Sequence, residues 1–187
     1  YKRQYIGWAF DKFGYEDPGA DVAVIISLMQ QVGEAERIPP DAETYVGPEQ
    51  LIRFMTAFVL KFAEYYPPTP EQAGAIGALM DSDVSNSDVI SPYGNGDSGT
   101  IYRLREGVER FMITDINNPG ASAMAQSTLP LMFDHIAVAV TMFNHVPGGS
   151  NVLFMDGHVE FQRYEERGSG LANSHVAHSL GLMALAL

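Results

Sequence analysis

Cysteine is absent from this chain of 187 residues, and its absence removes several kinds of site at once. No disulfide can staple the fold, no c-type haem can be attached, and no thiolate can hold zinc. Long apolar runs are also absent, since none approaches the ~20 residues that a helix needs to cross a bilayer. The opening residues Tyr1-Lys-Arg do not have the pattern of a signal peptide. We therefore expect no membrane span in this chain.

Basic residues are few, with 11 Lys and Arg against 23 Asp and Glu, which gives a formal net charge of −12. Nucleic acids and anionic membranes are bound through basic patches, so we expect neither as a partner. The negative charge fits a secreted or cell-surface protein and favours divalent cations. Hydrophobic residues make up an ordinary 46% of the chain. The length predicts one domain with a core large enough to fold alone.

A tight β-hairpin is the strongest local signal in the chain. Asp156-Gly157 lies between two apolar alternating runs, and this pair favours a two-residue turn with positive φ at both positions. Such a turn places Phe154 opposite Val159 and Val152 opposite Phe161. Because side chains alternate between the two faces of a strand, these four apolar residues are predicted to face the core.

Helices and strands follow from the spacing of the remaining apolar residues. Helical spacing over 101–112 directs Leu104, Val108 and Phe111 inward, with Glu106 and Arg110 paired outside. Residues 171–187 predict an apolar helical tail beyond a globular domain of residues 1–170. Such a tail either packs on its own domain or docks into a neighbouring subunit. The further predicted elements are strands over 1–14 and 130–134 and helices over 22–36, 48–66 and 70–80.

An acidic loop over residues 81–99 is a candidate calcium site. Asp81, Asp83 and Asp88 stand among Ser, Asn, Gly and Pro, and hard cations take several oxygen ligands at close spacing. The run does not have the spacing of an EF-hand. Solvated loop carboxylates are the alternative interpretation.

A second group mixes His and carboxylates, a combination that can ligate zinc or do acid–base work. No HExxH-like spacing, Gly-x-Ser-x-Gly, P-loop or dinucleotide fingerprint accompanies it. We therefore predict no enzyme, and expect Asp156 to stabilise its turn and His145 to anchor the loop of Gly148 and Gly149. The group comprises Asp115, Asp134, His135, His145, Asp156 and His158.

The stretch from Gly99 to Asp134, followed by His145 and the Asp156-Gly157 hairpin, resembles a known family. It is similar over residues 93–166 to the prepilin-type processing-associated domain named for its His and its Asp-Gly pair, a family of pilin-like and type II secretion pseudopilin-like bacterial proteins. Ten residues separate His145 from Asp156, one more than the family's name implies. The usual leader and long N-terminal apolar helix are not recognisable here.

The resemblance implies an α+β fold: a pilin-like globular domain with an antiparallel β-sheet packed by helices, without the usual long N-terminal apolar helix. It implies a structural subunit that self-assembles as a helical homo-oligomer, alone or with other pseudopilins. The product would be an extracellular pilus-like filament or a type II secretion pseudopilus, at the cell surface or in the periplasm of a bacterium. The alternative is a calcium-stabilised cell-surface module that binds glycans or secreted substrates. On either view His145, Gly148, Gly149, Asp156 and Gly157 form a structural motif.

Overall fold

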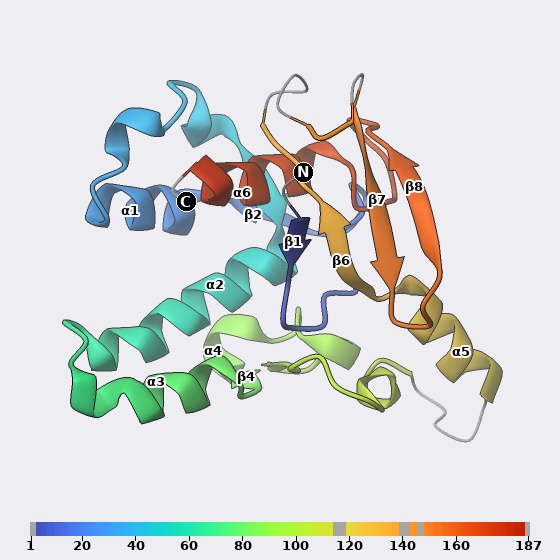
Figure 1. The fold of residues 1–187 in the computed structure, drawn as a ribbon, viewed down its shortest axis with the longest axis horizontal. Coiled ribbons are helices and arrows are strands. Elements are labelled where there is room, and N and C mark those ends of the chain that lie inside the picture. Colours follow the sequence, from blue (N-terminus) through green and yellow to red (C-terminus); the bar gives the residue numbers. More distant parts are fainter. Residues whose placement is uncertain (1–2, 114–118, 139–142, 146–147, 186–187) are drawn as a thin grey trace.

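A four-stranded antiparallel sheet is the centre of the fold (Figure 1). The computed structural model describes residues 3–113, 119–138, 143–145 and 148–185. The strand order is β1-β6-β7-β8, formed by β1 (Arg3–Tyr5), β6 (Pro130–Asp134), β7 (Gly149–Phe154) and β8 (Val159–Arg163). Two small antiparallel ladders join β2 (Gly19–Asp21) to β3 (Val46–Pro48) and β4 (Val84–Ser85) to β5 (Thr100–Ile101).

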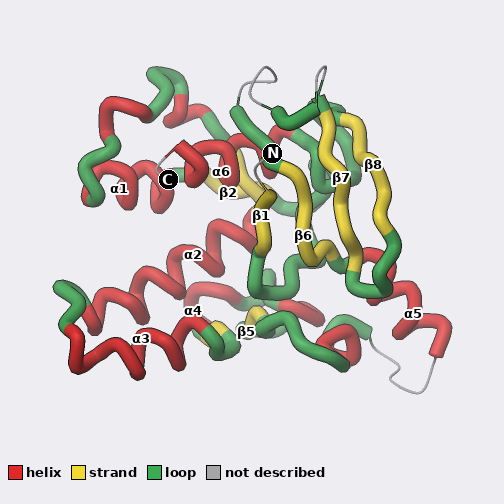
Figure 2. The backbone as a smooth tube through the Cα atoms, in the orientation of Figure 1, coloured by secondary structure: helices red, strands yellow, loops and turns green. Residues whose placement is uncertain are grey.

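The helices gather mainly on one side of this sheet, at the left of Figures 1 and 2, while α5 extends from its lower right end. Antiparallel sheets and helices in one chain confirm the predicted α+β class. The expected helices over 22–36, 48–66 and 70–80 appear as α1, α2 and α3, each shortened, with a 3-10 turn beside it in the chain. The helices are α1 (Ala23–Gln31), α2 (Glu49–Phe62), α3 (Ala73–Met80), α4 (Ser87–Ile90), α5 (Pro119–Thr128) and α6 (Ser174–Leu185).

The core lies between the inner face of the sheet and helices α2 and α6. Phe133, Val152 and Phe154 point inward from β6 and β7, and they share one buried cluster with Phe54 of α2 and Leu180 of α6. Burial of each such side chain contributes about 1.5–3 kcal/mol. Among the described residues, the core thus packs on one face of the sheet, and the other face carries exposed side chains such as Tyr5, Val159 and Phe161.

Helix α6 closes the core by packing against β3 and α1. Gly181 permits a close approach of α6 to the segment that follows β6, because a Cβ there would lie 2.5 Å from the backbone nitrogen of Val138. On the same helix His178 stacks on Tyr45 with ring centroids 4.2 Å apart, and burial lowers the pKa of His178. Of the two interpretations of this tail, the described part of the helix thus packs on its own chain.

The hairpin forms, but the predicted register is wrong. Phe154 N–H donates to the carbonyl oxygen of His158 at 3.0 Å, which makes Met155, Asp156 and Gly157 a three-residue loop. Only Gly157 in this loop has a positive φ, of 91°, as expected for a loop that ends in a glycine bulge. The extra loop residue shifts the pairing by one position.

Because of this shift, Val159 pairs with Leu153 and Phe161 with Asn151. Val152 and Phe154 are buried as predicted, whereas Val159 and Phe161 are 62% and 52% exposed. A slip of one residue moves a side chain to the other face of the sheet. The outer face therefore receives two apolar residues that the sequence assigned to the core.

The predicted helix over 101–112 is also wrong. Backbone groups of Tyr102 and Leu104 bond to Ala9 and Gly7, which continues the β5 segment as an extended chain. Only Val108–Phe111 forms a 3-10 turn, and it follows Gly107 at φ 79°. Val108 is buried as predicted, whereas Phe111 is 38% exposed. The strand predicted over 1–14 is reduced to β1 and one bridge at Trp8.

Candidate functional site

The outer face of the sheet carries a mixed polar and apolar surface. Strand alternation directs every second residue outward, and three of the outward residues are large and exposed: Tyr5 at 58%, Val159 at 62% and Phe161 at 52%. We call this surface the outer sheet face. Its members are Arg3, Tyr5, Met132, Asp134, Asn151, Leu153, Val159 and Phe161.

Asp134, His145 and Asn151 form a hydrogen-bonded triangle at one end of this face. Oδ2 of Asp134 lies 2.8 Å from His145 Nε2 and accepts a hydrogen bond from Asn151 Nδ2 at 2.8 Å. The backbone N–H of Asn151 donates to the same oxygen at 3.3 Å. His145 Nε2 is 2.9 Å from Asn151 Nδ2. The proton position on His145 thus selects whether this nitrogen donates to Asp134 or accepts from Asn151.

Asp134 is held as a carboxylate. Burial by itself would raise its pKa, but hydrogen bonds from Asn151 and His145 outweigh this and lower the pKa of Asp134 below its ordinary value. Only Oδ2 takes part in these bonds. Within the described residues, Oδ1 of Asp134 accepts no hydrogen bond.

A pocket of about 340 Å³ opens on this face beside the triangle. Its polar lining residues are Asp134, Asn151 and Arg3 of the neighbouring strand. Arg3 is the register partner of Asp134 across β1 and β6. The remaining lining is apolar and comprises Met132, Phe133, Leu153 and Val159.

His145 and Asp156 lie at opposite ends of β7 and do not form one site. Asp156 Oδ1 accepts the backbone N–H of His158 at 3.0 Å and lies 2.6 Å from His158 Nδ1. The backbone hydrogen bond is the first cause of the lowered pKa of Asp156, and the His158 side chain is the second. Asp156 thus binds within its own loop, as we expected of a turn residue.

Gly149 allows strands β7 and β8 to approach closely at the other end of the hairpin. A Cβ at Gly149 would lie 2.5 Å from Cζ of Phe161 and 2.8 Å from the carbonyl oxygen of Gln162. Gly148 precedes it at φ 134°. Of the remaining candidates, Asp115 lies outside the described residues, and His135 follows directly after β6.

Two of the three candidate ligands in the acidic loop lie against arginines. Asp83 accepts hydrogen bonds from both terminal guanidinium nitrogens of Arg105, at 2.7 and 2.9 Å, and from the backbone N–H of Arg103 at 2.8 Å. The Arg105 hydrogen bonds lower the pKa of Asp83. Asp81 lies 3.4 Å from Arg103, and Asp88 is exposed on α4. In the part of the chain that the structure describes, no three His, Asp or Glu side chains could hold a metal ion together.

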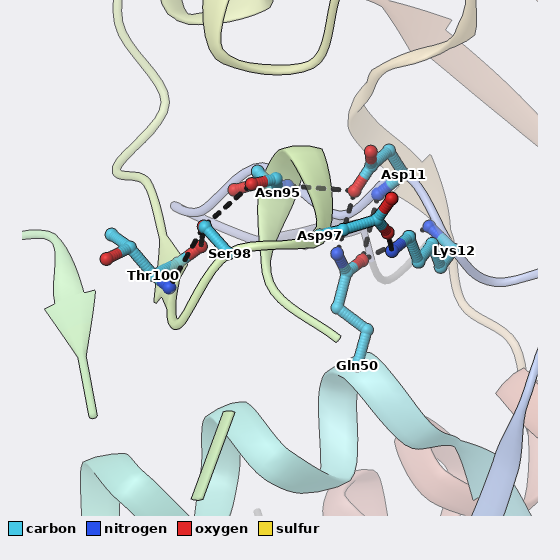
Figure 3. A network of polar contacts seen from close by, with 7 residues as sticks. All are labelled: Asp11, Lys12, Gln50, Asn95, Asp97, Ser98 and Thr100. Atoms are coloured by element: carbon cyan, nitrogen blue, oxygen red, sulfur yellow. Dashed lines mark hydrogen bonds and ion pairs between the residues drawn. The ribbon is translucent and has the colours of Figure 1, made fainter. Parts of the chain in front are cut away.

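The loop of residues 94–99 is tied into the core. Asn95 is 1% exposed and donates through Nδ2 to the carbonyl oxygen of Ala9 and to Oδ1 of Asp11, at 3.0 and 2.8 Å. Its Oδ1 accepts the backbone N–H of Tyr102 at 2.9 Å. Gln50 of α2 binds Asp11 from the other side (Figure 3). The network holds the segments 8–12, 94–100 and α2 together.

An apolar groove of about 700 Å³ lies among α1, α2, α3 and the end of α6. None of its lining residues is charged, and Val32, Tyr66 and Met80 on its walls are 65%, 74% and 43% exposed. We call it the α2 groove. Its lining comprises Trp8, Leu28, Gln31, Val32, Phe54, Met55, Phe58, Val59, Phe62, Ala63, Tyr66, Met80 and Met183.

Sequence reasoning missed Asn151 as the hydrogen-bond partner of Asp134 and Arg3 as its cross-strand neighbour. Asn is depleted in strands, so an Asn within the run Gly149-Ser-Asn-Val-Leu-Phe was a usable signal for a polar contact. Arg3 gave no such signal, because its neighbour on β6 lies more than a hundred residues away.

Comparison with protein-family models, curated proteins and solved structures finds no match to this chain. The resemblance drawn from residues 93–166 therefore stays a prediction. Among the described helices, none combines the length and the apolar character that a bilayer crossing requires.

Proposed function

We propose that this protein is a structural subunit that assembles head to tail with copies of itself. The product is a bacterial pilus-like filament outside the cell or a type II secretion pseudopilus in the periplasm, alone or with other pseudopilins. The observation that carries the proposal is the presence of two different surfaces with large exposed apolar side chains, the α2 groove and the outer sheet face. An open polymer needs two unlike surfaces that fit each other, because one self-complementary patch closes into a dimer.

The two surfaces lie far apart on the molecule. In Figure 1, α1, α2 and α3 occupy the left end of the long axis, whereas β8 lies on its right side. When the groove of one copy binds the sheet face of the next, the sheet face of the first copy and the groove of the second are therefore still available. Repetition of the same contact extends the chain of subunits.

Charge favours a second copy of this chain as the occupant of the groove. Two copies with a net charge of −12 each repel one another, so they can meet only where carboxylates are scarce. The groove lining contains no charged residue. The adjoining helix α3 consists of Ala, Gly, Ile, Leu and Met, and none of its residues is buried. Large exposed apolar surface of this kind is typical of interaction sites.

Paired variants test the head-to-tail arrangement. A groove variant carries Val32→Glu and Met80→Glu, and a sheet variant carries Val159→Glu and Phe161→Glu. All four positions are exposed, so both variants are expected to fold. Leu60→Glu is the matched control, because Leu60 is 54% exposed but does not line the groove.

Analytical ultracentrifugation and electron microscopy provide the measurements. We expect polymers from the wild type and the control, and monomers from each double variant alone. An equimolar mixture of the two variants should stop at a heterodimer, because each contributes one intact surface. A wild type that stays monomeric at millimolar concentration would refute self-assembly. A sheet variant that still forms dimers would refute the head-to-tail contact.

A further inference from the structure

We propose that the pocket between β1, β6 and β7 binds a free α-amino acid with an aliphatic side chain. Asp134 would bind the α-ammonium group, Arg3 the α-carboxylate, and Met132, Leu153 and Val159 the side chain. All its residues belong to one chain, so a single subunit can form the site, although the pocket lies on the outer sheet face that polymers would cover.

The carboxylate of Asp134 has one oxygen atom that can accept a hydrogen bond from a ligand. Its Oδ2 is saturated by His145 and Asn151, which fix the carboxylate plane, while Oδ1 accepts no hydrogen bond within the described residues. The side chain of Asp134 is only 11% exposed. A partly buried carboxylate with one unused oxygen is suited to a charge-assisted hydrogen bond from an ammonium group.

Arg3 provides the opposite charge in the same pocket. It is the register partner of Asp134, so the two side chains start from neighbouring positions on one face of the sheet. Nevertheless, no ion pair joins Arg3 to any of the residues that the structure describes. The pocket thus presents a negative and a positive group that are not paired with each other. A ligand that carries both charges on one carbon atom complements them.

The rest of the lining decides between ligand classes. A volume of about 340 Å³ is in the range of small-molecule sites. Hard cations need several oxygen ligands, and Asp134 is the single acid in this lining, beside a guanidinium group. A sugar ring would stack on an exposed aromatic face, but Phe133 in this pocket is 2% exposed. The aliphatic lining instead fits a side chain such as that of leucine.

Calorimetric titration with L-leucine tests the proposal, and the groove variant is used so that polymers do not cover the outer sheet face. N-acetyl-leucine lacks the ammonium group and isoamylamine lacks the carboxylate, so both should bind at least about tenfold more weakly. Arg3→Gln should weaken leucine binding by a similar factor without lowering the melting temperature. Arg163→Gln, on the exposed part of β8, is the matched control and should bind leucine as before.

Three results would overturn the proposal. The first is no heat of binding with leucine at millimolar concentration in a folded protein. The second is equal binding of leucine and isoamylamine. The third is unchanged leucine affinity in Arg3→Gln. Because a folded monomer is titrated, none of these results bears on head-to-tail assembly, whose failure would be seen in the ultracentrifuge instead.

Discussion

Replacing Asn95 by Ala should strongly destabilise this protein. The Asn95 amide joins two chain segments, since it accepts from the Tyr102 backbone and donates to the Ala9 carbonyl and to Asp11. The Asn95 side chain thus adds one more hydrogen-bonded link between residues 7–9 and residues 102–104. Within the described residues, the Tyr102 N–H and the Ala9 carbonyl have no other partner.

The magnitude follows from the groups left without partners. An unsatisfied buried polar group costs about 1–3 kcal/mol, and Asn95→Ala leaves two, namely the Tyr102 N–H and the Ala9 carbonyl. Asp11 keeps the hydrogen bond from Gln50 Nε2 at 2.7 Å, so its loss is smaller. We therefore expect the free energy of unfolding to fall by about 3–5 kcal/mol.

Urea unfolding of a non-polymerising variant measures this change, with the midpoint shifting and the slope staying constant. Asn86→Ala is the matched control. Asn86 caps α4 through one hydrogen bond, to Val89 N–H at 3.2 Å, and its removal should cost about 1 kcal/mol. Equal losses in the two variants would refute the role assigned to Asn95.

Three further predictions concern ionisation and metal binding. Burial lowers the pKa of His178, so the unfolded chain takes up a proton first and stability is lost as pH falls below the unfolded value of about 6.5. The melting temperature should drop from pH 7 to pH 5, and less steeply in His178→Phe; parallel profiles would contradict this. The lowered pKa of Asp134 contributes stability above the unfolded value of about 3.9, which is lost as pH falls through the lower folded value. In Asp134→Asn, the urea unfolding midpoint should decrease less between pH 5 and pH 2 than in the wild type. An equal decrease in the two proteins would argue against this role of Asp134. Because Asp83 is occupied by Arg105, millimolar calcium should leave the wild-type melting temperature unchanged, and a clear rise would show that the acidic loop rearranges to bind the ion.

The sequence predicted those elements best that carry one strong local signal. Helix α2 follows from its apolar spacing, and the hairpin of β7 and β8 exists where Asp156-Gly157 indicated it. The predicted register of the hairpin is wrong because its loop holds three residues instead of two. Hairpin loops of two and three residues differ little in energy, so the sequence does not decide between them. One residue of loop length decided whether Val159 and Phe161 are buried.

The candidate site was partly predictable. His145 and Asp134 were both candidates, but their contact with Asn151 depends on how β6 and β7 are aligned. The segment after Ile101 reads as a helix in isolation, yet its backbone groups are used by Gly7 and Ala9. Partners that lie far apart in sequence overrode the local helical pattern.

The position of α6 has a consequence for how the chain is made. Val176, Leu180 and Leu182 of this helix are at most 5% exposed and complete the core formed by elements that are synthesised much earlier. While the ribosome is still adding residues before Ser174, β3 and α1 lack the helix that covers them. The nascent chain thus carries uncovered apolar surface until α6 emerges, and such surface is prone to aggregation during synthesis.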